Sequence, residues 1–188
     1  MLGLDPVRRY AWADEDINLA WTLAVITGRT TAEVVGAYGG DQSRSPQIMP
    51  FAKACVPLDE LGTYSLVQVW EAGDCVVAVE NTGWRGASAD VAKRASAGDG
   101  SFISVFWNLN ANYKLTQAVG GELVASFDPL TVQPSAPVGE TYPEWITEVV
   151  FTDDGLHAEL LAVVEQQTGL TVEQAWLTEP LPTYRAPA

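Results

Sequence analysis

The chain has few of the residues on which metal and nucleophile chemistry usually depends. Its 188 residues include two cysteines, Cys55 and Cys75, and one histidine, His157. This set cannot form a Cys/His zinc site, and the carboxylate spacing of a calcium loop is missing as well. Both cysteines lie in apolar stretches typical of strands, so we expect buried thiols, with a disulfide between paired strands as the alternative. We therefore expect neither a metal nor another cofactor.

Basic residues are also scarce. Ten Lys plus Arg stand against 24 Asp plus Glu, which gives a formal net charge of −14, and the acids are spread along the chain. Binding to nucleic acid requires clustered cations that displace counterions from phosphates, and an anionic membrane surface makes a similar demand. We therefore expect no nucleic-acid or membrane partner. An acidic surface serves solubility alone or attracts a basic protein partner, and both readings stay open.

Several sequence signatures are absent. No apolar run reaches membrane-spanning length, and the opening MLGLDPVRRYAWADED lacks the apolar centre of a signal peptide, so we expect a cytoplasmic protein. Glycine patterns of phosphate and dinucleotide loops are missing, as is the Gly-x-Ser-x-Gly elbow of many hydrolases. His157 lies in a helical pattern, where packing or surface exposure is expected rather than a catalytic triad.

The apolar patterns that are present begin with a helical signal. Residues 12–40 are expected to form two helices. Asp14 is the expected cap of the first and Gly28 its stop, and Thr30 with Glu33 forms a capping box for the second.

The middle of the chain reads mainly as strands over residues 51–130. A hairpin turn is expected at Gly73-Asp74 and another at Gly120-Gly121. Between them, the segment after the strand 75–80 predicts one short helix with Ser88 as its cap. Residues 101–119 then read as one long strand.

The last part is expected to contain a Pro-rich connector at 131–150, a helical pair at 153–177 and an irregular tail at 178–188. Asp153 or Asp154 is the expected cap of this pair. Together these patterns predict one α+β domain over 1–188. Its central antiparallel sheet of about five strands would be packed by an N-terminal and a C-terminal helix pair.

Three asparagines interrupt the long strand in VFWNLNANYKL. If this segment is extended, Asn108, Asn110 and Asn112 share one face, opposite Trp107 and Leu109. Amides are costly to bury without partners, so we expect this face to be solvent-accessible. Substitution by serine would then be nearly neutral for stability.

Four phrases of the sequence are similar to a known group of proteins. They are WADEDINLAWTLAVITGRT, GDCVVAVENTGWRGA, VFWNLNANYKLTQAVGGELVASFDPL and QTGLTVEQAWL. Over about residues 12–176 the chain resembles an actinobacterial, Streptomyces-type family classed as a domain of unknown function. The resemblance implies a bacterial, cytoplasmic protein, and it brings no activity, cofactor or catalytic residue.

The segment around 80–88 is the main candidate for a binding site. It follows an apolar strand and opens a helix, so its backbone N–H groups could face an anion. Glu80 and Arg85 add charge, and Trp84 offers a flat surface for stacking. The alternative is a tight strand-to-helix turn in which the glycines supply backbone freedom and the tryptophan is buried.

Three functional hypotheses follow from these features. The first is a non-enzymatic protein-binding module, for example an immunity-type or regulatory protein with a basic partner, because no catalytic set is complete. The second is a small-molecule or carbohydrate binder, or a hydrolase, that uses the 80–88 loop and the face of Asn108, Asn110 and Asn112. A concave pocket at the loop would favour this second hypothesis. The third is a subunit of a larger assembly that docks through the connector or the tail.

Overall fold

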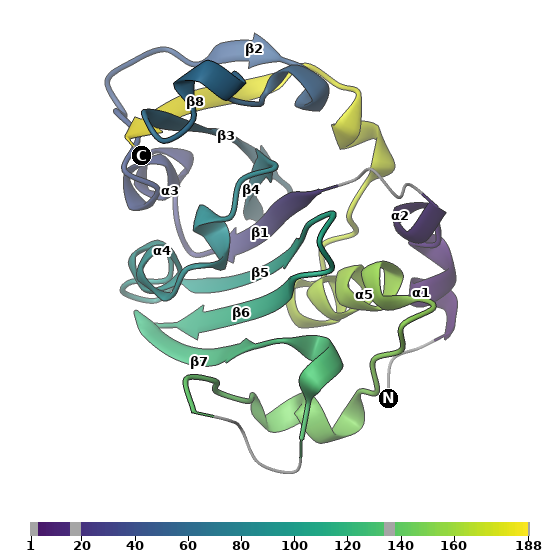
Figure 1. Cartoon of the computed structure of the whole chain (residues 1–188). Coiled ribbons are helices and arrows are strands. Elements are labelled where there is room, and N and C mark those ends of the chain that lie inside the picture. The colour runs from purple at the N-terminus through teal and green to yellow at the C-terminus, as the bar shows by residue number, and fades with distance from the viewer. Residues whose placement is uncertain (1–3, 16–19, 134–137, 188) are drawn as a thin grey trace.

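The computed structural model describes residues 4–15, 20–133 and 138–187, and its centre is an eight-stranded antiparallel sheet (Figure 1). In chain order the strands are β1 (Trp21–Thr27), β2 (Gln47–Met49), β3 (Tyr64–Ala72), β4 (Cys75–Asn81), β5 (Ser101–Trp107), β6 (Tyr113–Val119), β7 (Glu122–Phe127) and β8 (Leu181–Pro187). Their order in the sheet is β2-β8-β3-β4-β1-β5-β6-β7. The two chain ends therefore do not form separate helical layers, because the C-terminal residues enter the sheet.

Helices cover both faces of the sheet. The α-helices are α1 (Leu4–Arg9), α2 (Trp12–Glu15), α3 (Thr31–Ala37), α4 (Ala89–Ala95) and α5 (Leu156–Thr168). Figure 1 shows α3 and α4 on one side of the sheet and α5, α1 and α2 on the other. Short 3-10 turns occur at Phe51–Lys53, Leu58–Glu60, Arg85–Ala87, Pro129–Thr131, Glu144–Glu148 and Gln174–Leu177. None of the helices in the described part of the chain has both the length and the apolar composition that a membrane crossing needs.

The prediction of about five strands flanked by helix pairs is wrong, and β1 shows why. Residues 21–27 were expected to continue a helix from Asp14 to Gly28, but they form a central strand between β4 and β5. Leu23 and Val25 face α5, while Ala24 and Ile26 face α3 and α4. A strand buried on both faces is an unbroken apolar run, and such a run also satisfies helical spacing. Residues 16–19 of the expected helix lie outside the described residues.

The tail at 178–188 is the second correction. Residues 181–187 form β8, which pairs with β3 along most of its length and with β2 over three residues. Pro182 and Pro187 lie near the two ends of this strand, so the residues between them keep their N–H groups for the ladder. The tail is therefore part of the sheet, and it is not a free docking arm.

The C-terminal helical pair is the third correction. Only α5 is an α-helix, followed by the 3-10 turn at 174–177. Asp153 and Asp154 do not cap it: the cap position is Gly155, and the carboxylate of Asp14 accepts from the N–H groups of His157 and Ala158 at 3.0 and 3.1 Å. Asp14 was predicted to cap a helix in its own segment. It lies in α2 instead, and its carboxylate caps the start of α5.

Local signals gave correct predictions. The capping box of Thr30 and Glu33 starts α3, and Ser88 caps α4. The Gly73-Asp74 turn joins β3 to β4, and Gly120-Gly121 joins β6 to β7. In each case the residues that determine the structure are neighbours in the sequence.

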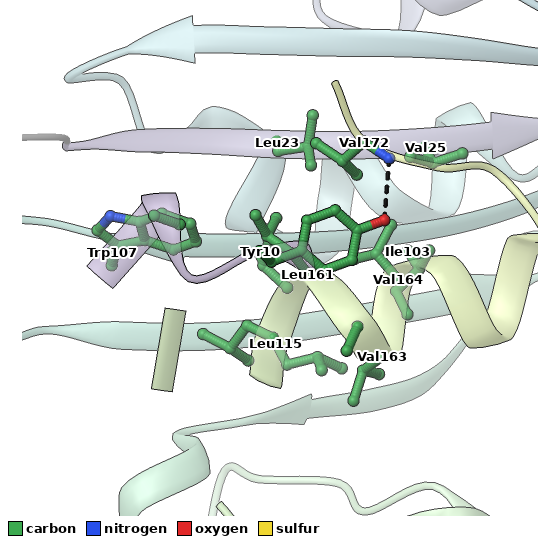
Figure 2. Packing of buried hydrophobic residues seen from close by; sticks show 14 of the residues in the cluster. Tyr10, Leu23, Val25, Ile103, Trp107, Leu115, Leu161, Val163, Val164 and Val172 are labelled. Carbon is green, nitrogen blue, oxygen red and sulfur yellow. Dashed lines mark hydrogen bonds between the residues drawn. The ribbon is translucent and has the colours of Figure 1, made fainter. Parts of the chain in front are cut away.

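The larger core lies between the sheet and α5. Figure 2 shows Leu161, Val163 and Val164 of the helix among side chains from the strands, with Tyr10 beside them. The hydroxyl of Tyr10 accepts a hydrogen bond from the Val172 N–H at 3.1 Å. Burial, reinforced by the neighbouring Glu165, raises the pKa of Tyr10 to about 12, so the phenol stays protonated at neutral pH.

Candidate binding site at the end of β4

Glu80, near the end of β4, organises the loop that follows it. Its side chain is 1% exposed, and its two carboxylate oxygens accept from the backbone N–H groups of Arg85 at 3.3 Å and Gly86 at 2.7 Å. The loop folds back because this buried carboxylate binds its backbone donors. A side chain at position 86 would meet the Tyr38 hydroxyl at 2.5 Å, so the close return of the backbone requires glycine.

Burial raises the pKa of Glu80 to about 7, and the two backbone donors and the Arg85 charge oppose this shift. The same environment raises the pKa of Tyr38 well above its ordinary value, first by burial and then through the charge of Glu80. Glu80 therefore changes its charge near neutral pH inside a closed backbone turn.

Three buried hydroxyls on neighbouring strands hold the carbonyl groups of the same loop. They are Thr22 on β1, which donates to Gly83 O at 2.6 Å, Ser104 on β5, which donates to Gly86 O at 2.7 Å, and Thr116 on β6, which donates to Ala87 O at 3.1 Å. Buried polar groups on a sheet require partners, and here the loop backbone supplies them. The loop is consequently fixed against the α4 side of the sheet.

A pocket with a volume of about 580 Å³ opens beside this loop. It lies between the segment 54–66 and the segment 80–94, and its lining includes Glu80, Trp84 and Arg85. This volume is within the range of small-molecule sites. Three of the six predicted site residues therefore come together at one concave surface.

Trp84 and Arg85 occupy different positions in this pocket. Trp84 is 65% exposed, so the alternative in which it is buried under the new helix is wrong. Arg85 is half-buried, and its guanidinium donates to the Ser65 hydroxyl at 3.0 Å and to the carbonyl of Pro187. These contacts fix the arginine between β3 and β8.

The three asparagines are not on a strand face. The segment predicted as one strand is the hairpin of β5 and β6, and 108–112 form its turn. Asn108 Oδ1 accepts from the N–H of Asn110 at 2.9 Å and of Asn112 at 3.2 Å, and Ala111 has a φ of 54°. Asparagine favours such turns because its side chain can replace a backbone acceptor.

The turn lies at the same end of the sheet as the Glu80 loop, because Trp21 of β1 pairs with both Asn81 and Trp107. The asparagines do not line the pocket. Asn110 and Asn112 are exposed, as predicted, and Asn108 is partly buried. Phe102 and Ser104, which would share the asparagine face if the whole segment were one strand, are both buried on the α4 side of the sheet.

The turn leads to a revised mutational prediction. Asn108→Ala removes the oxygen that accepts from Asn110 and Asn112, so we expect it to destabilise the protein by ~1 kcal/mol. Asn110→Ala is the matched control, since no hydrogen bond of its side chain is found among the described residues, and its expected effect is within ~0.5 kcal/mol. Urea denaturation of the two variants checks the difference. Equal stabilities would contradict the turn assignment.

Several residues of the pocket were not among the predicted site residues. Arg94 of α4 donates through Nε and Nη2 to the carbonyl of Ala37 at 3.0 and 2.8 Å, beside the pocket. Leu61 and Leu66 reach it from the segment before β3 and from β3 itself. Arg94 lies one helical turn after Asp90 on the helix that follows the predicted loop, so it could have been suspected. The two leucines could not, because the pairing of β3 with β8 and β4 positions them.

The remaining candidates for chemistry lie apart from this pocket. His157 stacks on Trp107 with ring centroids 4.5 Å apart, on the α5 side of the sheet. Cys75 is buried as predicted and Cys55 is exposed, and both are free thiols. In the described ranges no three His, Cys, Asp or Glu side chains gather closely enough to hold a metal.

Comparison of the sequence with known protein families assigns the chain to one of them. A family model described as "Family of unknown function (DUF6461)" matches residues 6–181, and the chain belongs to that family. The expectation of a domain of unknown function is therefore confirmed. Neither a curated protein nor a solved structure matches the chain.

Proposed function

We propose that the protein is a non-enzymatic binding protein that takes up a small organic ligand in the pocket between residues 54–66 and 80–94. The observation that carries the proposal is the concave pocket of about 580 Å³ beside an exposed Trp84 and a fixed Arg85. Apolar and aromatic walls with a few oriented polar groups are typical of ligand sites. A bacterial, actinobacterial origin and a cytoplasmic location belong to the same proposal.

The geometry at Glu80 supports binding over catalysis. A carboxyl group with a pKa of about 7 is a general acid or base candidate, but both of its oxygens bind backbone N–H groups of the loop. Its role is to hold the loop, and the stacked His157 lies across the sheet. Among the described residues that line the pocket, Asp90 is the other carboxylate and neither a histidine nor a cysteine is present, which favours binding over the hydrolase alternative.

Trp84→Ala tests the proposal. Saturation-transfer NMR with a set of small aromatic compounds is expected to detect ligands of the wild type, and the variant should bind them at least about tenfold more weakly, as for a Trp anchor. Leu109→Ala is the control, because Leu109 is 66% exposed but lies in the β5–β6 turn. Equal binding by wild type and Trp84→Ala would overturn the assignment of the pocket.

A protein partner is the second candidate function. Leu61 is exposed and lines the pocket together with Trp84, and Leu58, three residues earlier in the chain, is also exposed. Exposed apolar side chains that gather at one surface are typical of a partner site. In this version a partner side chain enters the pocket. A pull-down with the two variants tests this function. A partner protein that is captured by Leu109→Ala but not by Trp84→Ala would support it. A partner captured equally by both variants would contradict it.

A further inference from the structure

The positive charges of this acidic protein are unevenly distributed around the pocket. Arg85 and Arg94 line it, and a second pocket of about 400 Å³ is lined by Arg44 and Arg185. The two pockets share Tyr64 and Leu66 in their lining, so they adjoin along β3. Four of the ten basic residues of a chain with a net charge of −14 therefore lie at two adjoining pockets.

Within the described residues, three of these four arginines have no acidic partner at salt-bridge distance. Among the described residues, Arg44 pairs with Asp41 at 3.1 Å, but no carboxylate lies within 4.0 Å of the guanidinium nitrogens of Arg85, Arg94 or Arg185. Arginine is otherwise easily paired in such an acidic chain, as Arg29 is with Glu33. The acids that line the larger pocket, Glu80 and Asp90, do not contact these groups as ion pairs.

Neutral groups hold the three guanidinium groups in place. The contacts of Arg85 are a hydroxyl and a carbonyl, those of Arg94 are to one carbonyl, and Arg185 stacks 3.6 Å from the centroid of the Tyr64 ring. Such contacts fix the orientation of a guanidinium without pairing it directly with a carboxylate, although the Arg85 charge also acts on the nearby Glu80. An oriented arginine whose guanidinium is not in an ion pair can form charge-assisted hydrogen bonds with a carboxylate or a phosphate.

Apolar side chains form much of the remaining wall of the larger pocket, beside the polar residues Ser65, Asn81, Thr82 and Ser88. Val56, Leu61, Leu66 and Val91 contribute to its walls, and Trp84 projects at its edge. A simple inorganic anion would leave these surfaces in water. A ligand that fills the pocket therefore needs an apolar body as well as a negative charge.

We propose that the pocket recognises a small organic anion, an aromatic or apolar body that carries a carboxylate or a phosphate. The anionic group binds at Arg94 and Arg85, and the body packs against Trp84 and Leu61. This inference rests on the proposed function and adds the class of ligand. It also reverses the expectation of a basic partner at this surface, since arginines repel cations.

Matched ligands test the charge. Isothermal titration calorimetry compares 1-naphthoate, 1-naphthyl phosphate and the neutral 1-naphthamide, with inorganic phosphate as the probe for an anion alone. At least one naphthyl anion is expected to bind at least about tenfold more tightly than the amide, which corresponds to one charge-assisted contact. Inorganic phosphate is expected to bind more weakly than the naphthyl phosphate.

Variants of Arg94 locate the contact. Arg94→Gln is expected to reduce the preference for the anion over the amide to less than about threefold, and Arg94→Lys is expected to retain part of it because a point charge remains. Arg8→Gln on α1 is the control for net charge and should leave the preference unchanged. Far-UV circular dichroism confirms that each variant is folded.

The outcomes separate the two proposals. Equal affinities for the amide and the anions would overturn the anionic ligand class while leaving the pocket as a binding site. Inorganic phosphate binding as tightly as naphthyl phosphate would overturn the requirement for an apolar body. An unchanged preference in folded Arg94→Gln would overturn the role of Arg94. Binding by none of the probes would overturn the ligand class, and the proposed function would be rejected only if the wider NMR screen also found no ligand.

Discussion

The free energy of unfolding of Glu80→Gln, relative to that of the wild type, is expected to rise by about 3 kcal/mol between pH 5 and pH 8. The carboxyl group of Glu80 has its pKa raised from 4.5 to about 7, so the folded protein holds this proton more tightly than the unfolded chain does. The stabilisation from the protonated group is complete below about pH 4.5 and is lost as the pH passes 7. A shift of this size corresponds to about 3 kcal/mol.

Urea denaturation at pH 5, 6, 7 and 8 measures this effect as the difference between variant and wild type. Glutamine keeps the acceptor for the Gly86 N–H and remains neutral, so its stability should lack the fall that Glu80 causes. Glu122→Gln on β7 is the control, because Glu122 is exposed. Parallel stability curves for Glu80→Gln and the wild type would show that burial does not raise the pKa of Glu80.

Leu161→Ala is expected to destabilise the protein by about 2–5 kcal/mol, as for other large-to-small changes in a core. Leu161 of α5 is fully buried between the helix and the sheet (Figure 2). The cost includes the lost transfer free energy and the cavity that the neighbouring strands cannot fill.

Leu109→Ala provides the comparison for this change, since the same atoms are removed from a side chain that is 66% exposed. Its expected effect is within about 0.5 kcal/mol. Thermal and urea unfolding of both variants measure the difference. Equal effects in the two variants would contradict the packing of α5 on the sheet.

Features with local causes could be predicted from the sequence. The capping box at Thr30, the Ser88 cap and the two glycine turns each depend on residues a few positions apart. Their hydrogen bonds form within one turn, so the residue types suffice to identify them.

Features that depend on the partner of a segment could not be predicted. The run at 21–27 fits a helix or a strand, and only the pairing of β1 with β4 and β5 decides between them. Residues 181–187 become a strand because β3 offers them an edge. Short apolar runs have no intrinsic period that reveals such neighbours.

The candidate site also combines features with local causes, which could be predicted, and features that depend on distant segments, which could not. Glu80, Trp84 and Arg85 were identified because they lie in one loop that joins a strand to a helix. The asparagines were assigned to the wrong structure, because alternation suggested a strand where their side chains form a turn. Leu61 joins the site through long-range packing, and the sequence alone does not show that proximity.

The central claim is that the pocket beside Trp84 is the binding site, and two-dimensional ¹H–¹⁵N NMR with 1-naphthoate tests it most directly. The predicted result is that the Trp84 indole N–H and the backbone amides of Arg85, Gly86 and Leu61 shift together in a saturable manner, while those of the 108–112 turn do not. Shifts confined to that turn or to α5, with the Trp84 and Arg85 signals unchanged, would contradict the claim.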